Sequence, residues 1–161
     1  MSQKILYIRK IALGLMTGSV LLVGPSLAND EVKENPRLQH RHNVMEIVKY
    51  SLLGMKAIIS GDVKDQSQFP ELAASMANAA SVASKMFKED TRELEGKTDA
   101  KDKIWANWED FSKRMDAFNS AAQELAVVAK EGDMNKNIIA FKNTAKNCKA
   151  CHDEYQKEHD H

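Results

Sequence analysis

The sequence is poor in the residues that build turn-rich folds and disulfide scaffolds. Its 161 residues include only 7 glycines, 3 prolines and 2 cysteines, and aromatic residues make up 6%. So few turn formers argue against an all-β fold, and two cysteines cannot supply a disulfide framework. The core is therefore expected to consist mainly of aliphatic, alanine and methionine side chains.

An excess of charge of either sign is also lacking, because 23 Lys and Arg balance 23 Asp and Glu. Nucleic-acid binding needs a basic stripe that displaces counterions, so no nucleic-acid partner is expected. The sequence has neither a glycine-rich phosphate loop nor a Ser/His/Asp signature. Nothing in it therefore indicates an enzyme.

Residues 1–28 have the pattern of a cleavable secretory signal peptide. A basic start precedes an apolar run at residues 11–23, and the small residues that signal peptidase reads end at Ala28. An uncleaved membrane anchor is the alternative, but the run is shorter than the ~20 apolar residues that span a bilayer. Cleavage would export residues 29–161 to the periplasm. The removed segment contains three basic residues and no acidic ones, so the exported chain would carry a net charge of −3.

Apolar residues at spacings of three and four predict four amphipathic helices in the exported chain. These segments are residues 35–60, Pro70 to Phe87, Ile104 to Ala129, and Ile138 to Tyr155. No segment alternates with the period of two that is typical of a strand. The pattern predicts an all-α antiparallel four-helix bundle, with an irregular helical domain as the alternative.

Single residues mark the expected helix ends and one unusual position. Thr98 or Asp99 is expected to cap the third helix, and Asp133 or Asn135 the fourth. Gly54 lies in the middle of the first helix, where it costs about 1 kcal/mol relative to alanine. Either the helix tolerates it, or a helix, a cofactor or a second subunit approaches closely there.

Both cysteines lie in one pentapeptide, Cys148-Lys149-Ala150-Cys151-His152, which is the Cys-x-x-Cys-His attachment signature of c-type haem. On a helix, positions i, i+3 and i+4 share one face. Two thiols on that face can add to the two vinyl groups of one porphyrin, while His152 reaches the iron from the same side as the proximal ligand. The motif therefore predicts one covalently bound haem c, an iron protoporphyrin.

Other uses of these cysteines stay open. A disulfide is one, although a helical Cys-x-x-Cys is strained for it. A thioredoxin-like pair is another, but it would need a βαβ context that the sequence does not show. Zinc could be bound by Cys148, Cys151 and His152, with His159 or His161 completing four ligands.

The sixth coordination position of the iron can be filled by Met, His or Lys, or stay open, and Met raises the reduction potential for electron transfer. Met45 is the candidate, because Arg41 lies one turn before it on the same predicted helix face. A cation at that place can pair with a haem propionate, although a solvated surface charge is an equally good interpretation of Arg41. Most of the other methionines are expected to fill the core.

Beyond this motif, the chain resembles the class II c-type cytochromes, the family of cytochrome c′ and cytochrome c-556. The resemblance covers essentially residues 29–161. It rests on the C-terminal stretch from Cys148 to Tyr155, on Arg41 to Met45, and on Ile104 to Phe111. It implies an exported four-helix bundle with one haem, often homodimeric through its first helices.

The resemblance also implies roles for two residues of the first helix. Arg41 would lie near the propionates, and Met45 on the distal side of the iron. In the c-556 branch a methionine there ligates the iron and gives a low-spin electron carrier. In the c′ branch the distal residue borders a five-coordinate, high-spin iron that binds nitric oxide or carbon monoxide.

The leading prediction is therefore a periplasmic cytochrome that transfers single electrons to redox partner proteins, with iron ligated by His152 and Met45. The alternative is a high-spin cytochrome c′ that binds diatomic gases. One position departs from the family pattern, since the family usually has a basic residue where this chain has Gln156. This departure weakens any analogy to gas chemistry on the proximal side.

Overall fold

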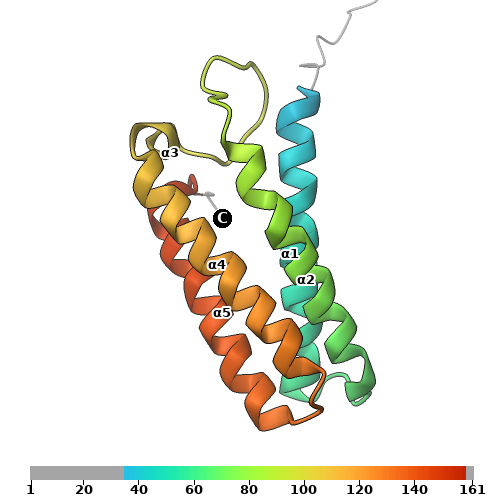
Figure 1. The fold of residues 1–161 in the computed structure, drawn as a ribbon. Helices are drawn as coiled ribbons and strands as arrows, with labels where there is room; N and C mark the ends of the chain where they lie inside the picture. Colours follow the sequence, from blue (N-terminus) through green and yellow to red (C-terminus); the bar gives the residue numbers. More distant parts are fainter. Residues whose placement is uncertain (1–34, 159–161) are drawn as a thin grey trace, which may run out of the picture. The chain divides into compact units, whose positions relative to one another are not determined.

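The structure is a computed structural model that describes residues 35–158, which form one compact unit. It contains four long helices: α1 (Pro36–Ser60), α2 (Phe69–Ala83), α4 (Trp108–Ala129) and α5 (Met134–Tyr155) (Figure 1). Three short elements join them: the 3-10 helices η1 (Gln66–Gln68) and η2 (Ser84–Phe87), and the single-turn α3 (Lys103–Ala106). The predicted signal peptide lies outside the described residues.

Successive long helices run in opposite directions and pack side by side (Figure 1). α1 packs against α2, α2 against α4, and α4 against α5, whereas α1 and α5 make few contacts with each other. The prediction of an all-α antiparallel four-helix bundle is confirmed. The gap left between α1 and α5 is the feature that positions the site.

The core has the expected composition. Its largest fully buried apolar side chains are Phe69, Met55, Met76, Ile104 and Leu125. Alanines cover much of α2 and α4, which lets these helices approach closely. None of the helices within residues 35–158 is long and apolar enough to cross a membrane.

The ends of α1 and α5 follow from local sequence. Asn35 caps α1, because its Oδ1 accepts a 3.0 Å hydrogen bond from the Arg37 amide. Gly61 ends α1 with a φ of 82°, a left-handed conformation that glycine adopts without strain. Asp133 caps α5 as predicted, with its side chain accepting from the amides of Asn135 and Lys136.

Two predicted helix boundaries are wrong. The third helix does not run unbroken from Ile104 to Ala129, because Asn107 leaves the helical conformation with φ −125° and ψ 46° and separates α3 from α4. Neither Thr98 nor Asp99 caps α3, since the residue before it is Asp102. The Thr98 hydroxyl instead accepts hydrogen bonds from the Ala100 amide and from Arg41.

Gly54 lies where another helix comes close. A Cβ atom at this position would lie 3.0 Å from Leu72 Cδ1 on α2. Of the two interpretations of this mid-helix glycine, the structure supports the close approach of a neighbouring helix.

Candidate haem site

A cavity of about 660 Å³ has walls from α1, α4, α5 and the loop of residues 88–102. This volume lies within the range of about 300–1,000 Å³ that is usual for small-molecule and cofactor sites. The cavity lies between α1 and α5, two helices that make few contacts with each other.

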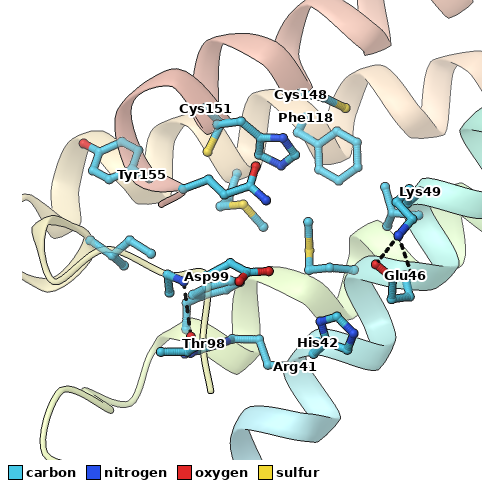
Figure 2. A pocket seen from close by; sticks show the side chains of 18 of the residues that line it. Arg41, His42, Glu46, Lys49, Thr98, Asp99, Phe118, Cys148, Cys151 and Tyr155 are labelled. Atoms are coloured by element: carbon cyan, nitrogen blue, oxygen red, sulfur yellow. Dashed lines mark hydrogen bonds and ion pairs between the residues drawn. The ribbon is translucent and has the colours of Figure 1, made fainter. Parts of the chain in front are cut away.

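The Cys-x-x-Cys-His motif forms part of the α5 wall. Cys148, Cys151 and His152 all line the cavity, as their shared helix face predicts. Figure 2 shows Cys148 and Cys151 on one side of the cavity, and Arg41 and His42 of α1 on the other. The structure therefore brings together the Cys-x-x-Cys-His motif and the Arg41 region of α1, the two segments that the sequence singled out.

Burial controls the protonation of the motif. It raises the pKa of both Cys148 and Cys151 to about 11, so both are neutral thiols at pH 7. A redox-active cysteine pair has a lowered thiol pKa instead, and the two sulfurs are free rather than joined in a disulfide. Desolvation at the cavity wall also lowers the pKa of His152, although the residue as a whole is exposed, and this favours the neutral imidazole that binds metals.

The zinc alternative gains no support from this geometry. Within residues 35–158, no group of three or more His, Cys, Asp or Glu side chains is placed to hold a metal ion. His159 and His161, the other suggested ligands, lie outside the described residues.

Arg41 and Met45 both line the cavity from α1. Arg41 is only 5% exposed, so the interpretation as a solvated surface charge is wrong. Its guanidinium donates to the Thr91 and Thr98 hydroxyls at 2.9 and 2.7 Å. Met45 is partly buried and packs against the apolar core.

Sequence reasoning missed several residues of the site. Met115 lines the cavity from α4, together with Phe111 and Phe118. Their helical spacing is the same as that of core residues, so no sequence signal separates them from the core. Thr91 and Thr98 lie in a loop without apolar periodicity, and nothing in the sequence pairs them with a residue of α1.

The residues present fit a haem c. Two thiols and an imidazole stand on one wall, and a buried cation is available for a carboxylate. An apolar lining suits a flat macrocycle. Its main apolar side chains are those of Leu38, Val48, Leu52, Phe87, Ile104, Phe111, Met115 and Phe118.

Comparison with known proteins agrees with this fit. Residues 37–156 match the family model described as Cytochrome C′. A cytochrome c′ from Alcaligenes xylosoxydans is 37% identical over 60 residues, which cover 37% of this chain and 47% of that protein. The match therefore spans about half the length of this relative.

Solved structures match over more of the chain. Cytochrome c prime from Shewanella frigidimarina has a TM-score of 0.71 and 33% identity, covering 76% of this chain and 95% of that one. A nitric oxide complex of a cytochrome c prime variant from Alcaligenes xylosoxidans has a TM-score of 0.69 and 25% identity, covering 77% and 95%. The chain thus belongs to the cytochrome c′ family, whose cofactor is one covalently attached haem c.

Proposed function

We propose that this chain is an exported haem protein that binds nitric oxide or carbon monoxide, and that Met45 forms the distal wall of the gas site. The observation that carries this proposal is the cavity in which the attachment motif and Met45 stand on different helices. The family match and the nitric oxide complex of a relative favour gas binding over electron transfer.

Each residue of the motif has a defined part in this proposal. Cys148 and Cys151 would hold the haem through thioethers, and His152 would be the proximal ligand. When bound, the haem supplies an iron that can bind a diatomic gas or carry one electron. The protein itself supplies an apolar cavity, an imidazole on its wall and a buried cation, and we propose that it makes and breaks no substrate bonds.

Electron transfer with Met45 as the sixth ligand is the second candidate. It is favoured by the position of the Met45 thioether in the cavity, on the helix that carries Arg41. A methionine ligand would raise the reduction potential and close the site to gases. Redox partner proteins would then be the natural partners.

Absorption spectra of the ferrous protein with and without carbon monoxide separate these candidates. Gas binding predicts a high-spin spectrum that shifts on addition of carbon monoxide, and faster uptake in Met45→Ala, where the distal wall is smaller. Met115→Leu is the matched control, because Met115 lines the same cavity from α4. A low-spin, six-coordinate spectrum that turns high-spin in Met45→Ala would establish electron transfer instead. A protein without haem would contradict both.

Export and assembly are further parts of the proposal. We expect the periplasmic protein to lack residues 1–28, which intact-mass measurement of the purified protein tests.

We also expect a homodimer through α1, as the resemblance implies. The α1 surface leaves Ile47, Tyr50 and Leu53 exposed. Tyr50→Lys is expected to convert the dimer to a monomer in sedimentation experiments.

A further inference from the structure

The guanidinium of Arg41 is held by residues of the loop that follows η2. Its Nη1 donates a 2.9 Å hydrogen bond to Thr91 Oγ1, and its Nη2 donates a 2.7 Å hydrogen bond to Thr98 Oγ1. The two threonines lie 50 and 57 residues after Arg41 in the chain. Two fixed acceptors on different nitrogens restrict both the position and the rotation of the planar guanidinium.

Two aromatic rings, together with the two threonine hydroxyls, enclose the Arg41 guanidinium in what we call the Arg41 cage. The guanidinium carbon lies 4.8 Å from the centre of the Phe87 ring and 5.6 Å from that of Trp105. Trp105 is itself fixed, because its Nε1 donates to the carbonyl oxygens of Phe87 and Glu89 at 2.9 and 3.0 Å. Stacking of a weakly hydrated guanidinium on aromatic faces stabilises the cation inside the protein.

None of these partners neutralises the charge. Hydroxyls and rings are neutral, and none of the ion pairs found within residues 35–158 involves Arg41. Burial lowers the pKa of Arg41, because the charged guanidinium is less well solvated here than in water. A guanidinium has five N–H donors, so donors remain for an anion in the cavity that Arg41 lines.

We propose that Thr91, Thr98 and Trp105 are positioning residues that hold Arg41 so that its remaining donors meet a haem propionate. The inference rests on the proposed haem in this cavity and goes beyond it by assigning a function to the loop. The loop holds the Arg41 guanidinium in a fixed position, and this positive charge favours the reduced haem electrostatically. The reduction potential therefore depends on the two threonine hydroxyls.

The test is the reduction potential of the holo-protein, measured by spectroelectrochemistry at one pH and ionic strength. Thr91→Val and Thr98→Val remove the hydroxyls and keep the side-chain shape, and the double variant removes both acceptors. We expect a lower potential in the double variant and a larger decrease in Arg41→Gln. Thr91→Ser and Thr98→Ser keep the hydroxyls and are expected to retain the wild-type potential.

A matched control separates this function from simple anchoring of the loop. Glu89 of the same loop forms an ion pair with Arg37, an exposed neighbour of Arg41 on α1. Glu89→Gln removes that tie between α1 and the loop without touching the cage. It is expected to leave the potential unchanged, whereas a decrease as large as that of the double variant would contradict the proposal.

The outcomes also separate this inference from the proposed function. Haem content is measured first, and a wild-type protein without haem c would refute the proposed function. With haem present, an unchanged potential in both the double variant and Arg41→Gln overturns the inference. A shift in Arg41→Gln alone shows that the charge acts without the threonines, which overturns it as well. If the double variant does not fold, the two single valine variants provide the same comparison.

Discussion

Single side chains near the end of α5 tie the haem-attachment helix to α4. The Tyr155 hydroxyl donates a 2.6 Å hydrogen bond to Asp110 Oδ2, and Arg114 Nε donates to the same oxygen at 2.7 Å. Arg114 also donates from Nη1 to the Ala150 carbonyl oxygen. This cluster fixes the last turns of α5 against α4.

The acid dependence of stability reports on this cluster. The hydrogen bonds from Tyr155 and then Arg114 lower the pKa of Asp110, while burial and the same hydrogen bond raise the pKa of Tyr155 to about 12. A carboxylate with a lowered folded-state pKa stabilises the fold above its ordinary pKa of about 3.9 and loses this effect as the pH falls through the folded-state value. We therefore expect Asp110→Asn to lower the melting temperature at pH 7.

The same variant should differ less from the wild type as the pH falls from about 4 through the lowered folded-state pKa of Asp110, below which the wild-type carboxylate is protonated as well. Thermal melts of the holo-protein across this pH range provide the measurement. Asp116→Asn is the control, since Asp116 lies on the same helix and forms no hydrogen bond or ion pair within the part of the chain that the structure describes. A difference that stays constant down to pH 2 would contradict the assignment.

Gly54 tests the contact between helices α1 and α2. Alanine in place of a mid-helix glycine gains about 1 kcal/mol of helix propensity. Here the added Cβ would meet Leu72 at 3.0 Å, so the gain should be offset in the wild-type background. In a Leu72→Ala background the gain should appear in full.

A double-mutant cycle of Gly54→Ala and Leu72→Ala, followed by chemical denaturation, measures this coupling. Additive effects of the two substitutions would show that Leu72 moves aside without cost. Gly61→Ala provides a contrast, because Gly61 has a φ of 82° and open space around it, so its penalty is conformational and independent of Leu72.

Leu125 tests the packing of α4 at a position that does not line the cavity. Its side chain is fully buried in the core. Leu125→Ala should lower the free energy of unfolding by about 2–5 kcal/mol, the usual range for such a truncation. Val127→Ala on the same helix is the control, because Val127 is 63% exposed and its truncation leaves no cavity. Equal losses in both variants would contradict this placement of the core.

Periodicity located α1 and α5 to within a few residues, because each helix carries one continuous apolar stripe and a capping residue. It failed at Asn107, since the stripe of Ile104, Trp108 and Phe111 continues across the break. Trp105 leaves that stripe to donate to carbonyl oxygens of residues 87 and 89. Such a hydrogen bond between distant segments has no period and cannot be read from spacing.

The candidate site likewise contains features that spacing predicts and features that only tertiary contacts reveal. The placement of the two thiols and the imidazole on one cavity wall was predictable, because the three residues lie close together in sequence on one helix face. The burial of Arg41 was not, because it depends on Thr91 and Thr98 in a separate loop. Sequence spacing therefore predicts an attachment point for the cofactor, and tertiary structure was needed to identify what surrounds it.

Across the whole bundle, the two ends differ in how they are held together. Away from the cavity, fully buried side chains such as Met76 and Leu125 fill the core. At the cavity, α1 and α5 make few contacts with each other, and about 660 Å³ lies between the walls. Because interiors are normally close-packed, a cofactor that fills this cavity should contribute much of the fixed packing at this end.

We therefore expect a chain unable to attach haem to keep its helices but lose its fixed packing. In Cys148→Ala/Cys151→Ala/His152→Ala, far-UV circular dichroism should stay helical, near-UV signals should weaken, and the dye ANS should bind. Cys148→Ala alone keeps one thioether and the proximal imidazole, and should resemble the wild type. If the triple variant instead unfolds as cooperatively as the holo-protein with unchanged near-UV signals, side chains alone hold α1 and α5 in place. The haem would then occupy a preformed cavity rather than complete the bundle.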